Sequence, residues 1–408
     1  MSTTAPITPR PKQVGEVELT GSPSDRGRKI LTIFGTRPEV IKLAPVISSL
    51  DSAGKLFQTV NVTSSQHADL LYPLARLLGV RLDYDLQVMT HDQTPNIVCS
   101  RVLAALDDIL NRERPDLILV QGDTTTALAG ALAGFHQRIP VGHVEAGLRS
   151  YEPRDPYPEE MNRRLMTSLA SYHFAATPHN RETLLAEGVA LESIFVTGNP
   201  VVDSLKAILR RLEVTAETAK LLEASAGLRR IVLTTHRRES FGAVMSENLK
   251  AIRRFVEAHN DVALICPVHP NPAVERAVES TLAGHPRIHL TRPLSYDQFV
   301  AVLSQAWLIV SDSGGVQEEA PTLGKPLLIL RRNTERPEAV ASNVARLVGG
   351  DPERLAAMLE EAYQPGSWAE SVKKIRNPFG RGDSGRRIAR VVAQALGASA
   401  SVPAKFVN

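Results

Sequence analysis

The sequence predicts an α/β protein with two Rossmann-like, doubly wound domains that face a cleft. Short apolar runs alternate with longer amphipathic stretches, which is typical of parallel strands joined by helices. The alternation stops at a helical connector, residues 215–228, and then begins again, which indicates a second domain of the same class. A chain of 408 residues is too long for one ordinary domain and comfortable for two.

The apolar runs give the predicted strands in order. They are residues 29–34, 57–63, 117–120, 139–144, 172–176 and 194–197 in the first half, and 230–235, 262–268, 307–312 and 326–330 in the second. We expect a disordered leader at residues 1–28, a first domain at 29–198, a second domain at 199–372, a C-terminal segment and helix at 373–397, and a loose tail at 398–408.

Composition argues against several classes of protein. Basic residues number 47 and acidic residues 44, and the arginine doublets are scattered among acids, so nucleic acid is not expected as a partner. No apolar run approaches the ~18 residues that a membrane helix needs. The first 28 residues lack the apolar core of a signal peptide, so a cytoplasmic protein is expected. Two cysteines are too few for a disulfide framework.

Three acids are predicted to meet at one edge of the first sheet. Asp123 follows the strand at 117–120, Glu145 follows the strand at 139–144, and Glu159 opens a helix one turn before Arg163. Ligands of open α/β sheets bind beyond the carboxyl ends of the strands. Any one of these acids could merely cap a helix or complement its dipole. Their concentration in one loop system favours proton transfer on an anionic substrate.

Two turns between strand and helix are predicted to bind phosphate. After the first strand, a helix begins near Pro38 with Arg37 beside its N-terminus and Lys42 one turn further on, a ready site for an anion. In the second half, the glycines of the Ser-Gly-Gly turn at 313–315 would let backbone amides approach a phosphate. The two turns together imply a nucleotide-linked substrate between the domains.

The helix after the second of these turns carries further candidates. We expect it to begin near Val316, which would place Glu318 and Glu319 in its first turn. One of them could hold ribose hydroxyls while the other complements the helix dipole. Arg336, at the start of a later helix, is a second candidate partner of phosphate.

A redox or ATP-driven reaction is not expected. A G-x-G-x-x-G pattern exists at Gly380, Gly382 and Gly385, but it follows a loop and no βαβ unit surrounds it. No Walker A sequence is present. We therefore expect neither a cofactor nor a metal.

Eight ordered motifs resemble those of the non-hydrolysing UDP-N-acetylglucosamine 2-epimerases. They are GTRPEVIKLAP (35–45), QGDTTT (121–126), PVGHVEAGLRS (140–150), PYPEEMNRR (156–164), HRRESFG (236–242), PVHPNP (267–272), SDSGGVQEEAPTLGKP (311–326) and TERPE (334–338). The resemblance covers residues 29–396. It implies the two-domain GT-B arrangement with a nucleotide-binding second domain, a last helix that crosses back to the first domain, and a homodimer.

The resemblance also implies a reaction and its residues. UDP would be eliminated in the anti sense to give 2-acetamidoglucal and then added back, which converts UDP-N-acetylglucosamine reversibly to UDP-N-acetylmannosamine without a nicotinamide. Asp123, Glu145 and Glu159 match the catalytic carboxylates. His236 matches the catalytic histidine, a partner of the diphosphate, and Arg163 would orient Glu159. Substrate binding is implied for Arg37, Lys42, His269, Phe299, Ser313, Gly314, Gly315, Glu319 and Arg336.

Several alternatives stay open. Which carboxylate is the base and which the acid is not assigned, His269 could be only a structural group at a strand end, and Phe299 could pack in the core. The enzyme could hydrolyse its substrate. It could also act on a modified UDP-sugar, because residues 151–155 depart from the usual loop. A GT-B glycosyltransferase or a non-catalytic nucleotide-sugar sensor would also suit the fold.

Family members often bind a second UDP-sugar as an activator. Gln66 and His67 of that site remain here, but Asp69 and Asp92 stand at the other two positions. Acids that face a diphosphate should repel it, so we expect weak or absent substrate activation.

Overall fold

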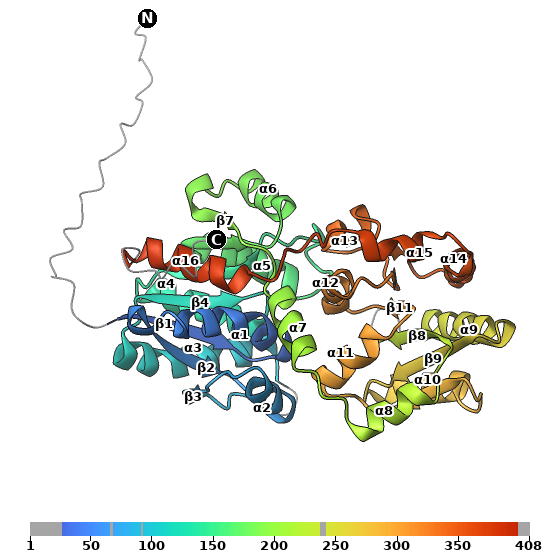
Figure 1. Ribbon diagram of the computed structural model, residues 1–408. Helices are drawn as coiled ribbons and strands as arrows, with labels where there is room; N and C mark the ends of the chain where they lie inside the picture. The colour runs from blue at the N-terminus through green and yellow to red at the C-terminus, as the bar shows by residue number, and fades with distance from the viewer. Residues whose placement is uncertain (1–26, 66–67, 91–92, 237–241, 399–408) are drawn as a thin grey trace, which may run out of the picture.

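Two parallel sheets follow one another along the chain in the computed structural model, which describes residues 27–65, 68–90, 93–236 and 242–398 (Figure 1). The first has the order β3-β2-β1-β4-β5-β6-β7 and the second β10-β9-β8-β11-β12-β13. Both orders reverse once, between β1 and β4 and between β8 and β11, as doubly wound sheets do. The predicted α/β class with two parallel sheets is confirmed. We call each sheet with its helices the first and the second domain.

The strands match the predicted runs except at three sheet edges. Their bounds are β1 Arg28–Phe34, β2 Phe57–Thr63, β3 Tyr84–Asp85, β4 Leu117–Gln121, β5 Val141–Ala146, β6 Tyr172–Ala175, β7 Ile194–Val196, β8 Arg229–Thr234, β9 Val262–Pro267, β10 Ile288–Thr291, β11 Leu308–Ser311, β12 Leu327–Ile329 and β13 Ala345–Leu347. The prediction missed β3, β10 and β13, which are edge strands of two to four residues. Such short segments carry no apolar run that could be recognised.

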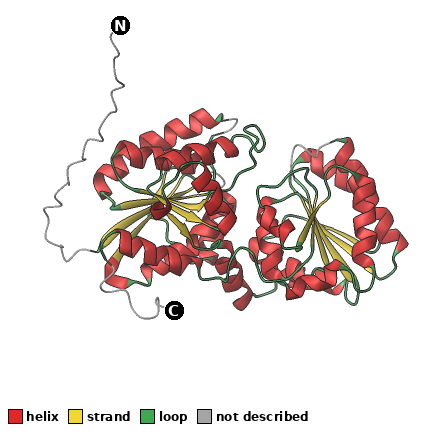
Figure 2. Ribbon diagram, turned by 90° about the horizontal axis from the view of Figure 1, so that it is seen from above, coloured by secondary structure: helices red, strands yellow, loops and turns green. Residues whose placement is uncertain are grey.

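Helices cover both faces of each sheet (Figure 2). Their bounds are α1 Arg37–Asp51, α2 Ala68–Leu77, α3 Pro95–Glu113, α4 Thr125–His136, α5 Glu159–Leu169, α6 Pro178–Ala186, α7 Val201–Arg210, α8 Ala216–Glu223, α9 Ala243–Ala258, α10 Pro272–Leu282, α11 Tyr296–Ser304, α12 Gly314–Leu323, α13 Pro337–Ala341, α14 Pro352–Tyr363, α15 Trp368–Ser371 and α16 Ser384–Ala395. In the described ranges, every helix is too short or too polar to span a bilayer.

Local sequence explains why the helices begin where they do. Proline stands in the first turn of α1, α3, α6, α10 and α14, where its missing N–H costs nothing. The Thr124 hydroxyl accepts a hydrogen bond from Ala127 N at 3.0 Å and so caps α4 directly after Asp123. All five residues of β4 are buried, because helices cover both faces of the sheet. The end of β4 is therefore held firmly in place.

The chain passes between the domains twice, and the two passages are adjacent. Asn199, just before α7, donates from its backbone N–H to the carbonyl of Phe379 at 2.7 Å. After Phe379 the chain enters α16, which packs against α1 of the first domain (Figure 1). Both carboxylate oxygens of Asp203 accept bonds from the first backbone amides of α16, at 3.1 and 3.2 Å. The last helix is thus fastened to the first domain at its N-terminal end.

The glycine pattern that the sequence analysis set aside serves this junction. Gly380 and Gly382 have positive φ angles of 121° and 84°, which a residue with a Cβ adopts only at a cost. Gly385 lies so close to α1 that a Cβ would overlap the carbonyl oxygen of Pro45. These contacts explain the pattern as packing and backbone geometry, without a dinucleotide.

Replacing Gly385 by alanine is expected to lower the free energy of unfolding by about 1–3 kcal/mol, the usual cost of overpacking. The backbone of Pro45 cannot move aside as a flexible side chain could. Gly350→Ala is the matched control, because its Cβ would meet Val244 at an ordinary 3.5 Å. Urea denaturation of both variants checks this prediction, and an equal effect of the two would contradict it.

Candidate active site

The carboxyl ends of four strands place the candidate residues around the boundary between the domains. Arg37 and Lys42 follow β1, Asp123 follows β4, His236 follows β8 and the turn at 313–315 follows β11. These positions lie beside the points where the strand orders reverse, between β1 and β4 and between β8 and β11. The sheets thus bring together residues that are up to 278 positions apart, from Arg37 to Gly315, as was expected of parallel strands.

Glu145 lies inside β5 rather than after it, in an irregular position. Its φ angle is +69°, and the pairing with β6 shifts between Val144 and Ala146. A bulge of this kind turns a side chain out of the regular alternation, and bulges are common beside active sites. Positive φ is costly for a residue with a Cβ, so this backbone must be held by its surroundings. The strand ends at Ala146, two residues later than the expected strand 139–144.

Glu145 belongs to a buried charge cluster, which we define as Lys42, Glu145, Glu318 and Arg336. Lys42 Nζ lies 2.5 Å from Glu145 Oε1 and 2.8 Å from Glu318 Oε2. Arg336 Nε lies 2.5 Å from the other oxygen of Glu318, and its NH2 group 3.7 Å from Glu145. Lys42 and Glu145 belong to the first domain, Glu318 and Arg336 to the second. The cluster therefore joins the domains through ion pairs.

The two carboxyl groups of this cluster differ in their affinity for protons. Burial, and then the neighbouring charge of Glu318, raise the pKa of Glu145 above its ordinary value. Burial would also raise the pKa of Glu318, but Arg336 and Lys42 outweigh it and lower that pKa. Burial opposes the charge on Lys42, whereas Glu145 and Glu318 raise its pKa. The directions of these shifts favour a proton on Glu145 over one on Glu318.

Arg163 fixes Asp123 rather than Glu159. Its Nε and NH2 groups donate to Asp123 Oδ2 at 2.9 and 2.7 Å, and its NH1 group donates to Glu160 at 2.9 Å. Asn162 adds a bond to the Asp123 carbonyl oxygen at 2.8 Å. The Asp123 side chain remains 26% exposed, so it can meet a ligand. Glu160, which the sequence analysis did not single out, is fully buried and supports this arrangement.

Glu159 is the first residue of α5 and is partly buried, one position before Glu160. The expectation that Arg163 orients Glu159 is wrong, because the guanidinium donates its hydrogen bonds to Asp123 and Glu160. Four residues separate Glu159 from Arg163, but only three separate Glu160 from it. The shorter i,i+3 spacing also brings side chains together on a helix, and here it prevails.

His236 is held by an acid that the sequence analysis overlooked. Asp312, fully buried after β11, accepts from the His236 backbone N–H at 2.9 Å and lies 3.2 Å from His236 Nδ1. The imidazole stacks on His269 at 5.5 Å between ring centres and is 38% exposed. A bond at Nδ1 orients the ring and leaves Nε2 for a ligand. Burial and then His236 lower the pKa of His269.

The N-terminus of α1 is not the open anion site that the sequence suggested. The carboxylate of Glu39 folds back over it and accepts from the backbone amides of Gly35 and Thr36 at 3.0 and 2.8 Å. Its other oxygen accepts from the Thr124 hydroxyl at 2.7 Å, which ties the turn after β1 to the turn after β4. Burial raises the pKa of Glu39 to about 7. A phosphate would find these amides already occupied, although Arg37 beside them is exposed.

The glycine turn of the second domain opens α12 two residues earlier than expected, at Gly314. Ser313 is the N-cap, and a Cβ on Gly314 would lie only 2.9 Å from Arg336 NH1, so glycine allows the guanidinium to approach. Gly315 has room around it. Glu318 and Glu319 therefore lie in the second turn and are buried, not in the first.

Glu319 and Phe299 are placed by α11. The Tyr296 hydroxyl of that helix donates to Glu319 at 2.7 Å, and burial raises the pKa of Glu319 to about 7. Phe299 is partly buried and packs against the hydrophobic core. Its expected contact with a uracil stays a prediction.

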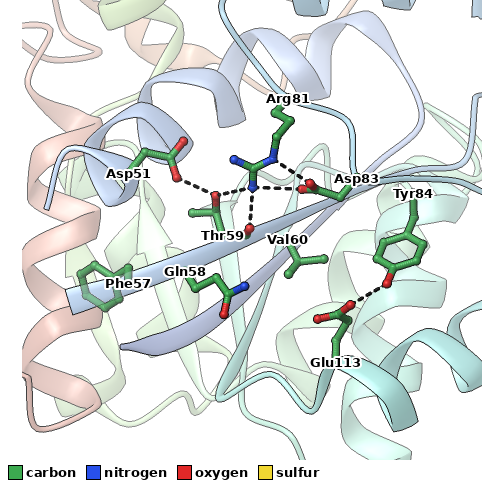
Figure 3. A pocket seen from close by; sticks show the side chains of 9 residues that line it. All are labelled: Asp51, Phe57, Gln58, Thr59, Val60, Arg81, Asp83, Tyr84 and Glu113. Carbon is green, nitrogen blue, oxygen red and sulfur yellow. Dashed lines mark hydrogen bonds and ion pairs between the residues drawn. The ribbon is translucent and has the colours of Figure 1, made fainter. Parts of the chain in front are cut away.

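A separate hollow of about 600 Å³ lies at the opposite end of the first sheet, around the start of β2 (Figure 3). Its polar side chains bond largely to one another. Arg81 donates to Asp83 at 2.6 Å and to the Thr59 carbonyl at 2.7 Å, and Tyr84 donates to Glu113. None of the expected site residues lines it.

The remnant second-substrate site cannot be placed. Gln66, His67 and Asp92 lie outside the described residues, as does the side chain of Asp69. Weak or absent substrate activation stays a prediction.

Comparisons with known proteins show which family the chain resembles. Residues 50–393 match the family model described as UDP-N-acetylglucosamine 2-epimerase. The UDP-N-acetylglucosamine 2-epimerase of Salmonella typhimurium is 43% identical over 366 residues, which cover 88% of this chain and 97% of that protein. The enzyme of the same name from Escherichia coli K12 is 41% identical over 88% and 97% of the two chains.

Solved structures show the same fold. The crystal structure of UDP-GlcNAc 2-epimerase from Neisseria meningitidis bound to UDP-GlcNAc has a TM-score of 0.85 at 37% identity, and covers 90% of this chain and 100% of that one. The Methanocaldococcus jannaschii enzyme in complex with UDP-GlcNAc and UDP has a TM-score of 0.77 at 33% identity, over 90% and 99% of the two chains.

Proposed function

Because this chain belongs to the UDP-N-acetylglucosamine 2-epimerase family, we propose that it interconverts UDP-N-acetylglucosamine and UDP-N-acetylmannosamine without releasing the free sugar. The observation that carries this proposal is the pair of acids at one sheet edge in different environments. Glu145 is buried with a raised pKa, whereas Asp123 is partly exposed and salt-bridged to Arg163. Inversion at a carbon needs a group that removes a proton and a group that supplies one.

We propose an elimination followed by an addition. A base removes the proton from C2 while the bond from C1 to the diphosphate oxygen breaks, which leaves a C1–C2 double bond and UDP. A proton then reaches C2 on the other face, and the diphosphate oxygen attacks C1 again. We assign Asp123 as the base, because its carboxylate can reach a ligand, and Glu145 as the acid, because burial and the neighbouring Glu318 raise its pKa. Glu159 stands near the start of α5 as the third acid of the family pattern.

The departing diphosphate needs positive charge and hydrogen-bond donors. Exposed Arg37, His236 with its ring oriented by Asp312, and the amides of the glycine turn at 313–315 can provide them. Lys42 and Arg336 add positive charge from the buried cluster. The groups come from both domains, so UDP would be bound across the boundary.

Incubation with UDP-N-acetylglucosamine in D2O, followed by proton NMR, tests the proposal. We expect UDP-N-acetylmannosamine to form, with deuterium at C2 in both epimers, because the C2 proton exchanges with solvent through the catalytic acids. Free N-acetylmannosamine with UDP would instead identify a hydrolysing enzyme. Absence of exchange despite UDP binding would direct the search to modified UDP-sugars.

We also propose that the protein is a homodimer. Met161 and Leu165 lie one turn apart on α5, and both side chains are exposed, as is Tyr157 just before the helix. An apolar stripe of this kind is typical of a surface that another protein covers. Double substitution of Met161 and Leu165 by glutamate should convert dimers to monomers in sedimentation experiments. Leu191→Glu, at an exposed apolar residue outside α5, should leave the dimer intact.

A further inference from the structure

Glu318 has no role in the reaction proposed above, yet its surroundings are unusual. It lies in the second turn of α12, and its side chain is 0% exposed. It reaches across the domain boundary to Lys42 of α1 at 2.8 Å, while Arg336 binds its other oxygen at 2.5 Å. A buried carboxylate between two cations is costly to desolvate, so a purely structural purpose would be served as well by apolar residues.

The charges around Glu145 show what Glu318 changes. Glu145 meets Lys42 of the first domain at 2.5 Å and the side-chain amide of Gln121, also of the first domain. It also meets Asn199, on the passage between the domains, at 3.3 Å. Each of these donates to a carboxylate and so favours the ionised form. From the second domain come Arg336 at 3.7 Å, which also favours ionisation, and Glu318, which opposes it and hydrogen bonds to Glu145. Glu335, bonded to Arg336 and Arg331, is the next charge outward.

We propose that Glu318 is a positioning residue that keeps Glu145 protonated and correctly oriented for proton transfer, and that it does so from the opposite domain. This inference rests on the proposed epimerase function, in which Glu145 is the acid. Lys42 and the amides of Gln121 and Asn199 favour the ionised form of Glu145, whereas its burial disfavours that form. Glu318 adds to the effect of burial by placing a second negative charge beside Glu145.

A consequence is that Glu145 is ready to donate a proton only when the two domains are together. Separation of the domains would remove Glu318 and Arg336 and admit water, and Lys42 would then hold Glu145 as a carboxylate. Protonation of the sugar at C2 would be confined to the arrangement that also surrounds the departing UDP. The reactive intermediate would then be protonated only where UDP is still at hand.

Glu318→Gln tests the proposal, because it removes the charge and keeps the shape. Without the neighbouring carboxylate the proton of Glu145 is held less tightly, so activity should be lost at lower pH than in the unaltered protein. We expect the alkaline limb of the kcat profile to move down by about one pH unit or more, and kcat at mildly alkaline pH to fall about tenfold or more. KM should change little, and Glu318→Asp should recover part of the alkaline limb.

Glu338→Gln is the matched control. Glu338 also contacts the opposite domain, through the Thr177 hydroxyl, but it does not belong to the charge cluster. Its substitution should leave the pH profile in place. If Glu318→Gln raises KM or lowers the melting temperature while its alkaline limb stays with that of the unaltered protein, then Glu318 only supports the cations and the proposal is overturned.

A measurement without substrate separates this inference from the proposed function. A protonated carboxyl group absorbs in the infrared at a frequency distinct from that of a carboxylate. The difference spectrum between the unaltered protein and Glu145→Gln should contain this band near neutral pH, and Glu318→Gln should abolish it. If the band is present in a protein that does not epimerise, the proposed reaction is wrong, but the proposed effect of Glu318 on Glu145 is retained. If the band is absent from the unaltered protein, Glu145 is not protonated and the proposed effect of Glu318 is wrong.

Discussion

Substitution of Asp123 by asparagine is expected to slow epimerisation by about 10²–10⁴-fold, the range that one positioned acid or base contributes. Arg163 already holds the side chain in place through two bonds to Oδ2, so the amide should keep the geometry and lose only the base. Both the exchange of the C2 proton with D2O and the formation of the epimer should fall together. Binding of UDP, measured by calorimetry, should change little.

Asp116→Asn is the control for this prediction. Asp116 lies just before β4, the strand that Asp123 follows. Like Asp123, it forms a salt bridge with an arginine, Arg28, and its side chain is 30% exposed. It differs from Asp123 chiefly in lying at the amino end of the strand. Its substitution should leave turnover unchanged. Exchange at C2 that survives in Asp123→Asn would show that another group is the base, with Glu159 the next candidate.

Substitution of Lys42 by methionine should cost about 3–5 kcal/mol of stability, as when one partner of a buried ion pair is removed. Methionine fills a similar volume, but Glu145 and Glu318 then face each other with Arg336 as their remaining cation. Urea denaturation gives the loss. Lys250→Met is the control, because Lys250 and its partner Glu247 are exposed to solvent and their ion pair should contribute little to stability.

The loss in Lys42→Met should depend on pH in a definite direction. Without the lysine, burial and mutual repulsion raise the pKa of the carboxyl pair in the folded protein above its value in the unfolded chain. Such groups are best tolerated when protonated, so stability is retained at acid pH. It is lost as pH rises above the ordinary pKa of glutamate, about 4.3. A loss that is equal at acid and alkaline pH would mean that packing rather than charge causes it.

The positions of the acids at the sheet edge could be predicted from sequence because the rule behind them is local. A strand that ends in a polar residue delivers that residue to the carboxyl edge of a parallel sheet, whatever the rest of the chain does. Asp123 and His236 follow this rule. Glu145 follows it only approximately, because a bulge in β5 places it inside the strand.

The partners of these residues could not be predicted, since pairing is decided by tertiary structure. Lys42 and Glu318 are 276 positions apart. They meet only because the carboxyl edges of the two sheets face each other across the domain boundary. Glu39, Glu160 and Asp312 likewise act by holding a neighbour of the site. The sequence offered one sign of these three residues. Each lies within three residues of a predicted site residue.

The paired passages of chain at Asn199 and Phe379 limit how the second domain can move. A domain that is joined at one point can swing in any direction. Two adjacent covalent connections, bonded to each other, leave one easy rotation, about an axis that runs through both. Any opening of the charge cluster should therefore follow a single reproducible arc and return Glu318 to the same place beside Glu145.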